Sequence, residues 1–151
     1  MTCALAAGCG GSGEPTARVG QAEQEKADSA RAVIAGWADT LRRSDVEGAT
    51  RYFGLPAIIE QGGDTYELAS RRDVRTFNAR LPCGARLTSV TRAHGYMIGT
   101  FRLGERPGKT CDAPGQIAKV ALIVKAGKIR EWRQIPNLVA PEAPQADAET
   151  A

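Results

Sequence analysis

The sequence predicts an α+β domain in which an antiparallel sheet packs on helices from the N-terminal half of the chain. Residues 116–136 have the pattern of two strands joined by a tight turn. Residues 86–103 have the pattern of a second strand pair, and residues 29–43 repeat apolar side chains at helical spacing. Because the helical pattern comes first and the long strands come last, we expect the helices to cover one face of the sheet.

The C-terminal strand pair carries the clearest strand pattern. Residues 117–124 form a short run rich in β-branched side chains between Gly115 and Gly127, which favours a central strand over a helix. Its even positions are wholly apolar and its odd positions are mixed, which is typical of a sheet with one face on a core. The partner strand covers 128–135, and Pro136 ends it because proline cannot donate a ladder hydrogen bond.

Three helices are expected before the long strands. The longest covers 29–43, where apolar residues recur at i, i+3, i+4, i+7 and i+8 after a capping serine. A short helix over 45–53 is expected to end at the glycine and proline that follow it. A third helix opens with a capping box formed by Ser70 and Asp73, and Pro82 stops it.

Two hairpins complete the predicted sheet. A short one pairs residues 57–60 with 65–68 around two glycines. A long one pairs residues 86–93 with 96–103 around His94-Gly95.

The register of the long hairpin decides which side chains meet the helices. We expect Thr91 to lie opposite Gly99, and Leu87 to lie opposite Leu103. The apolar face that should meet the helices then consists of Leu87, Ala93, Met97, Phe101 and Leu103.

Length and charge suit one basic domain with acidic flanks. The chain has 151 residues, enough to bury a core, and a net charge of +3. Residues 29–136 hold 18 Lys/Arg and 10 Asp/Glu, whereas residues 1–28 and 137–151 are mildly acidic. The basic residues are scattered and no aromatic-interleaved motif accompanies them, so we expect a solvated surface and no nucleic-acid partner. Residues 137–151 are rich in Pro and Ala without a period, which predicts a disordered tail.

Four cysteines fall into two pairs. Cys3 and Cys9 lie near the start, and Cys83 and Cys111 lie in the body. There is no C-x-x-C spacing and His94 is the only histidine, so we expect no metal and no cofactor. Cys83 and Cys111 should meet at one end of the sheet, where a disulfide would add about 3 to 4 kcal/mol and indicate an oxidising compartment. The alternative is two unrelated thiols in a cytoplasmic protein.

The run Leu5-Ala6-Ala7-Gly8-Cys9 resembles a bacterial lipobox, the signal after which a signal peptidase cuts and lipid is attached to Cys9. This resemblance implies an extracytoplasmic, membrane-anchored lipoprotein, with residues 1–28 as signal and flexible tether. Residues 16–26 are polar and unpatterned. Because no basic segment and no apolar segment of normal length precede Cys9, the translation start is expected upstream. A small-residue tail on a cytoplasmic protein is the alternative.

The order of elements resembles the nuclear-transport-factor-2-like superfamily, also called SnoaL-like. The residues that carry the resemblance are Val33-Ile34-Ala35-Gly36-Trp37, Asp45-x-x-Gly48-Ala49-x-x-Tyr52-Phe53 and Gly127-Lys128-Ile129-x-Glu131-Trp132-Arg133. The resemblance covers 29–136 and implies a cone: a curved antiparallel sheet of about four long strands plus a short hairpin, packed on three N-terminal helices. The superfamily includes isomerases, epoxide hydrolases, polyketide cyclases, dehydratases and binding modules with no chemistry, so the fold does not choose among them.

The resemblance places any active site inside the cone. Inner strand positions carry no carboxylate, and His94 falls in a turn. Glu131 shares its side of the strand with Arg133 and faces the same way as Lys119, which predicts a salt-bridged outer face. No acid–base pair emerges, so no catalytic residue is expected. The side chains expected to line an aromatic-walled pocket, unless they simply fill the core, are Trp37, Tyr52, Tyr66, Thr91, Trp132 and Gln134.

The sequence therefore favours a non-catalytic, envelope-associated domain that binds a small apolar molecule, an envelope component or a protein partner. The alternative is a small isomerase, cyclase or hydratase, which a carboxylate pointing into a closed pocket beside Tyr52 or Tyr66 would favour. Superfamily members often pair through their sheets, so a homodimer is expected through the mixed outer face, which consists of Thr88, Val90, Ile98, Thr100 and Ile123.

Overall fold

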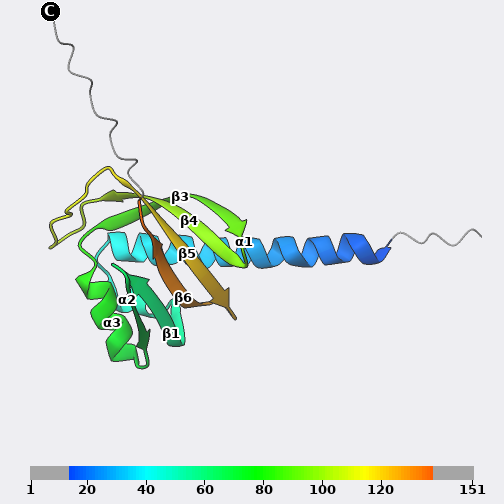
Figure 1. Cartoon of the computed structure of the whole chain (residues 1–151), viewed down its shortest axis with the longest axis horizontal. Helices are drawn as coiled ribbons and strands as arrows, with labels where there is room; N and C mark the ends of the chain where they lie inside the picture. Colours follow the sequence, from blue (N-terminus) through cyan, green and yellow to red (C-terminus); the bar gives the residue numbers. More distant parts are fainter. Residues whose placement is uncertain (1–13, 138–151) are drawn as a thin grey trace, which may run out of the picture.

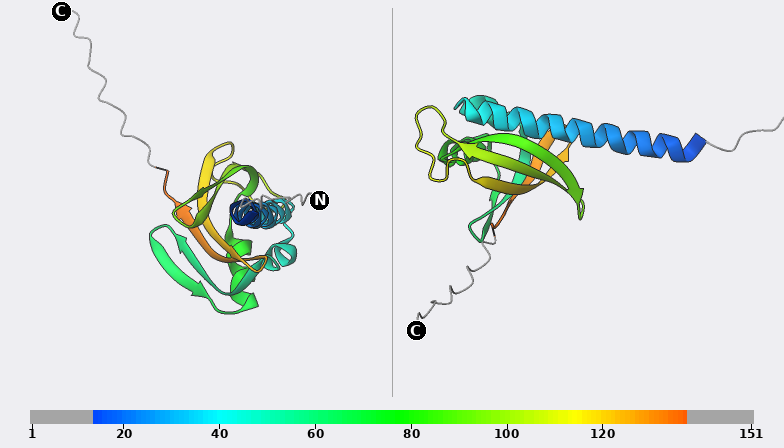
Figure 2. Two further views of the ribbon diagram at one scale, coloured as in Figure 1. Left: turned by 90° about the vertical axis from the view of Figure 1, so that its right-hand side faces the viewer. Right: turned by 90° about the horizontal axis from the view of Figure 1, so that it is seen from above.

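A six-stranded curved sheet wraps around the C-terminal half of a long helix in the computed structural model, which describes residues 14–137 (Figures 1 and 2). The helices are α1 (Glu14–Arg42), α2 (Val46–Thr50) and α3 (Arg71–Arg80). The strands are β1 (Phe53–Gln61), β2 (Asp64–Leu68), β3 (Gly84–Ala93), β4 (Tyr96–Gly104), β5 (Ile117–Lys125) and β6 (Lys128–Ile135). They lie in the order β2-β1-β6-β5-β4-β3, so the predicted α+β class is confirmed.

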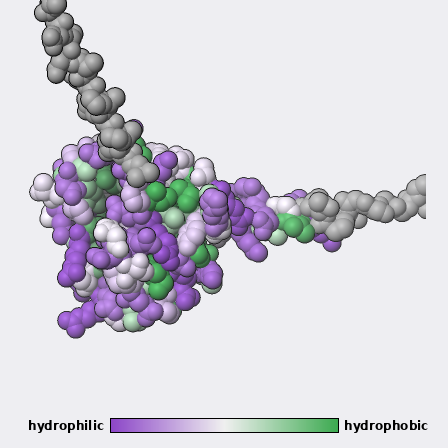
Figure 3. Space-filling view, viewed as in Figure 1, coloured by the Kyte–Doolittle hydropathy of each residue, from purple (hydrophilic) through white to green (hydrophobic). Residues whose placement is uncertain are grey.

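Helix α1 extends well beyond the predicted span. It begins at Glu14 rather than near residue 29, so its N-terminal half is helical and projects past the sheet (Figure 1). That half is covered mainly by hydrophilic residues (Figure 3). An ion pair of 2.7 Å between Glu23 and Arg92 ties it to β3. The apolar repeat covers only the buried C-terminal half, because only that half has a core to face.

The first strand contains residues that the sequence suggested would break structure. Gly54 and Pro56 lie inside β1, which pairs with β6 in parallel, an arrangement that the predicted antiparallel sheet did not include. The β1–β6 ladder shifts register between Phe53 and Ile58, so proline occupies a stretch without regular ladder pairing. The predicted capping box of Ser70 and Asp73 is present and opens α3. Asp45 caps α2 by accepting from the Gly48 N–H at 2.8 Å.

The β3–β4 register differs from the prediction. The turn has two residues with positive φ, His94 at 50° and Gly95 at 80°, which is the geometry of a two-residue type I′ hairpin. This turn places Thr91 opposite Ile98, so the predicted pairing with Gly99 was wrong by one residue. Leu87 lies opposite Phe101, not Leu103.

A β-bulge between Leu87 and Ser89 then exchanges the faces of the residues that follow it. Val90 packs against the core, so its predicted place on the outer face was wrong. Ala93 pairs with Tyr96 and shares its outer side, so the predicted inward position of Ala93 was wrong as well. The inward positions predicted for Leu87, Met97, Phe101 and Leu103 are confirmed, as is the apolar face of β5.

The predicted disulfide between Cys83 and Cys111 is present, with the two Cα atoms 4.4 Å apart. It fastens the 105–116 connection to the start of β3. Cys3, Cys9 and the tail from 138 onward lie outside the described residues. In the described part of the chain, no helix is both long and apolar enough to cross a membrane.

Candidate functional site

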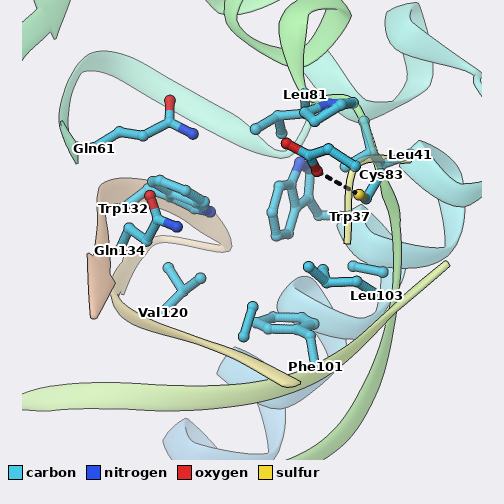
Figure 4. A pocket seen from close by; sticks show the side chains of 14 residues that line it. Trp37, Leu41, Gln61, Leu81, Cys83, Phe101, Leu103, Val120, Trp132 and Gln134 are labelled. Atoms are coloured by element: carbon cyan, nitrogen blue, oxygen red, sulfur yellow. Dashed lines mark hydrogen bonds between the residues drawn. The ribbon is translucent and has the colours of Figure 1, made fainter. Parts of the chain in front are cut away.

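A cavity of about 180 Å³ lies between α1 and the concave face of the sheet (Figure 4). Each wall comes from a different element. Helix α1 contributes Trp37 and Leu41, and the inner sheet positions contribute Ala85, Phe101, Leu103, Ala118, Val120, Trp132 and Gln134. Gln61, the last residue of β1, also lines the cavity. The rim beside the disulfide consists of Leu81, Pro82, Cys83 and Asp112.

Both tryptophans of the chain line this cavity. Trp37 is 2% exposed, and its indole N–H donates to Asn78 Oδ1 at 2.8 Å. The Asn78 amide in turn donates to the Val74 carbonyl at 2.9 Å, which links α1 to α3 through a buried chain of hydrogen bonds. The Trp37 ring meets Phe101 and Trp132 edge to face, with centroids 6.1 and 6.4 Å apart. This packing fixes the inner wall of the cavity.

Apart from the two indole N–H groups, the polar side chains of the cavity are two amides and one carboxylate. Gln61 and Gln134 border it on the side of Trp132 (Figure 4). The exposed Asp112 carboxylate lies 3.3 Å from the Cys83 sulfur, which is part of the disulfide and therefore has no hydrogen to donate. Among the described residues that line the cavity, Asp112 is the only acid, and no Lys, Arg or His joins it.

A second hollow, of about 350 Å³, adjoins the first and shares Gln61 and Leu81 with it. It lies between β2 and α3 and contains Tyr66, whose side chain is 41% exposed. The pKa of Tyr66 is raised, chiefly by partial burial and also by the Asp64 carboxylate, while Arg80 acts in the opposite direction. Tyr66 therefore belongs to an open, polar surface hollow beside the cavity.

The structure brings three of the six candidate pocket residues together. Trp37, Trp132 and Gln134 line the cavity. Tyr52 packs over Gly36 of α1, where an added Cβ would collide with its ring, and does not line the cavity. Thr91 is exposed.

Gln61 and Asp112 line the cavity but were not among the predicted pocket residues. Gln61 follows the predicted end of its strand and carries no pattern of its own. Asp112 could have been predicted, because it neighbours Cys111 and the predicted disulfide fixes where that segment lies.

The described residues offer no set of free metal ligands. Within residues 14–137, one group of three candidate ligands gathers, Cys83, Cys111 and Asp112. Its two sulfurs are bonded to each other, so neither is available as a thiolate.

The outer face of the sheet carries a charged network. Arg133 pairs with Glu131 at 2.9 Å and with Glu60 of β1, and Tyr96 donates to Glu131 at 3.1 Å. The two carboxylates raise the pKa of Arg133 further above its usual value. The predicted salt bridge between Glu131 and Arg133 is confirmed, and its second acid is Glu60 from the parallel strand.

No protein-family model matches the chain, and no curated protein matches it. Solved structures do. A candidate polyketide cyclase from Sinorhizobium meliloti is 13% identical with a TM-score of 0.54, over 68% of this chain and 93% of that one. An NTF2-like protein of unknown function from Cytophaga hutchinsonii is 10% identical with a TM-score of 0.54, over 70% and 87%. A protein with a ketosteroid isomerase-like fold from Catenulispora acidiphila, in complex with trimethylamine, is 11% identical with a TM-score of 0.51, over 70% and 85%.

These likenesses show the fold. The chain has the NTF2-like cone that SnoaL-like and ketosteroid isomerase-like proteins share, as the sequence resemblance implied. Identities of 10 to 13% carry no further information on activity.

Proposed function

We propose that this domain binds a small, mainly apolar, uncharged molecule in the cavity between α1 and the sheet. One observation carries the proposal: both tryptophans wall an apolar cavity whose amide and carboxylate groups are few and lie at its border. A cavity of roughly 150 Å³ lined by apolar side chains is large enough for benzene. A volume of about 180 Å³ therefore suits a molecule of one ring. The Catenulispora protein of the same fold was solved with a ligand smaller still.

The lining favours binding over acid–base catalysis. A general acid or base must come within hydrogen-bond reach of the reacting atoms. The single acid among the described lining residues, Asp112, is exposed at the rim and has no basic partner there. An isomerase, cyclase or hydratase would have to use this carboxylate, so Asp112→Asn separates the two functions: it would abolish turnover in an enzyme and leave binding of a neutral ligand intact.

The disulfide supports a location outside the cytoplasm. A buried disulfide in a small domain persists in oxidising compartments. Lipid attachment at Cys9 is a separate proposal, which the intact mass of the protein from its native membranes would test.

Fluorescence tests ligand binding directly, because both tryptophans line the cavity. Titration with toluene, anisole and acetophenone should give a saturable change in tryptophan emission, matched by calorimetry. Ala118→Leu places a larger side chain in the cavity and should abolish binding. Ala121→Leu is the matched control, since Ala121 alternates with Ala118 and Val120 and lies on the other face of β5. Equal binding by the two variants, or no saturation with any probe, would contradict the proposal.

A further inference from the structure

We infer that the indole N–H of Trp132 selects ligands that carry a hydrogen-bond acceptor, so that the cavity prefers a one-ring carbonyl or ether compound to the hydrocarbon of the same shape. This inference rests on the proposed function and assigns the class of ligand.

The indole nitrogen of Trp132 is a buried donor without a partner. The side chain is 4% exposed, and no acceptor in the described residues lies within hydrogen-bond distance of Nε1. Trp37, whose ring is in contact with that of Trp132, is also buried, but its N–H is held by Asn78 Oδ1 at 2.8 Å. Buried donors in folded proteins are nearly always paired, so the difference between the two indoles needs a reason.

Neighbouring rings do not supply a strong acceptor. Phe77 and Trp37 meet Trp132 edge to face, with centroids 5.2 and 6.4 Å away. The face of an aromatic ring accepts an N–H only weakly compared with a carbonyl or ether oxygen. A ligand oxygen would therefore gain a bond that the protein itself leaves unmade.

The surroundings of Trp132 define the rest of the ligand. Its ring meets that of Trp37 edge to face, and its nitrogen lies on the side that faces the cavity (Figure 4). No cationic side chain lines the cavity in the described part of the chain, and the one charged group, Asp112, repels anions. Carboxylates and phosphates are thus disfavoured, and the acceptor should be an uncharged oxygen on an otherwise apolar molecule.

A pair of probes with one shape isolates this effect. Acetophenone and α-methylstyrene differ only in that a C=O replaces a C=CH₂. Calorimetry should give a preference of the wild-type protein for acetophenone that falls about five- to twenty-fold in Trp132→Phe. Ala121→Leu, which lies on the other face of β5 and outside the cavity lining, is the control: the preference should stay unchanged.

A second measurement uses the wild-type protein and stands even if a variant fails to fold. With ¹⁵N labelling, the two tryptophans give two indole N–H signals, and that of Trp37 is identified by its proximity to the Asn78 amide. The Trp132 signal should move downfield with acetophenone and not with α-methylstyrene. If both probes bind but the signal and the preference do not respond, the inference is overturned and the proposed function stands. If neither probe binds, the proposed function is wrong.

Discussion

Two glycines of the same helix meet different surroundings. A Cβ on Gly36 would collide with the ring and hydroxyl of Tyr52, whereas Gly20 has no atom within 4 Å of such a Cβ. Gly36→Ala gains about 1 kcal/mol of helix propensity but overpacks a filled contact, which costs about 1 to 3 kcal/mol. We expect a net loss of stability for Gly36→Ala and a gain of up to about 1 kcal/mol for Gly20→Ala in urea unfolding. Equal effects of the two substitutions would show that the Tyr52 side chain moves aside at little cost.

Arg106 is a buried cation held by oxygen atoms of neutral groups. It is 4% exposed and donates to the carbonyls of Asn78 at 3.2 Å and Leu81 at 3.1 Å, at the C-terminal end of α3. Its third acceptor is the Ser44 hydroxyl at 3.1 Å. Burial lowers the pKa of the guanidinium, yet an arginine stays charged in a protein. The side chain therefore joins the turn between α1 and α2, the end of α3 and the 105–116 connection by direction-specific bonds.

Replacing this arginine should test that role. Arg106→Met leaves two carbonyls without their donor, and we expect a loss of about 2 to 4 kcal/mol in urea unfolding. Arg106→Lys keeps the charge but not the planar fork, so its loss should be intermediate. A Met variant as stable as the wild type would mean that water replaces the guanidinium.

At the scale of one element, the start of α3 should respond to acid. Asp73 accepts from the Ser70 hydroxyl at 2.7 Å and from the Ser70 N–H at 2.9 Å, and these bonds lower its pKa below the usual 3.8. As pH falls, the unfolded chain takes up this proton first, so the contribution of Asp73 to stability is complete above pH 3.8 and disappears as pH falls through the lower folded pKa.

The corresponding prediction is a pH-dependent difference between variants. Asp73→Asn should melt at a lower temperature than the wild type near pH 7, and the gap should close below pH 3.8. Ser70→Ala removes the partner of this carboxylate and should weaken the same acid dependence. A gap that persists unchanged at pH 2.5 would assign the loss to something other than charge.

An element could be predicted from the sequence where burial of one face imposes a regular spacing on its apolar side chains. Strand β5 and the buried half of α1 were predictable because a core on one face imposes a period on the side chains. The exposed half of α1 carries no such period, although it is helical. The bulge in β3 and the parallel pairing of β1 with β6 are set by backbone hydrogen bonds that side-chain alternation does not record.

The candidate site followed the same rule. Trp37 and Trp132 were predictable because they fall on the buried faces of a predicted helix and a predicted strand. Thr91 was not, since a shift of one residue moves a strand side chain to the opposite face of the sheet. Gln61 and Asp112 reach the cavity only through the tertiary arrangement of strand ends and the disulfide-bonded loop.

At the scale of the whole molecule, the disulfide should affect both stability and binding. Cys83 and Cys111 are 28 residues apart in sequence, and closing a loop of that size stabilises the fold by about 3 to 4 kcal/mol in the chain-entropy model. The double variant Cys83→Ser/Cys111→Ser should lose that amount in urea unfolding and bind acetophenone more weakly, because Cys83 and Asp112 form part of the cavity rim. Reduction of the wild type should reproduce both changes, and an unaltered midpoint would contradict the prediction.

The projecting half of α1 also makes the molecule anisotropic in rotation. A helix of 29 residues is about 44 Å long at about 1.5 Å per residue, and only its C-terminal half is embraced by the sheet (Figure 2). The molecule therefore tumbles as an elongated top whose long axis follows α1. The peptide N–H bonds of the helix lie almost parallel to that axis and reorient most slowly, while those of the curved sheet point in many directions. The ¹⁵N relaxation rates of the backbone amides therefore depend on the angle between each N–H bond and this helix.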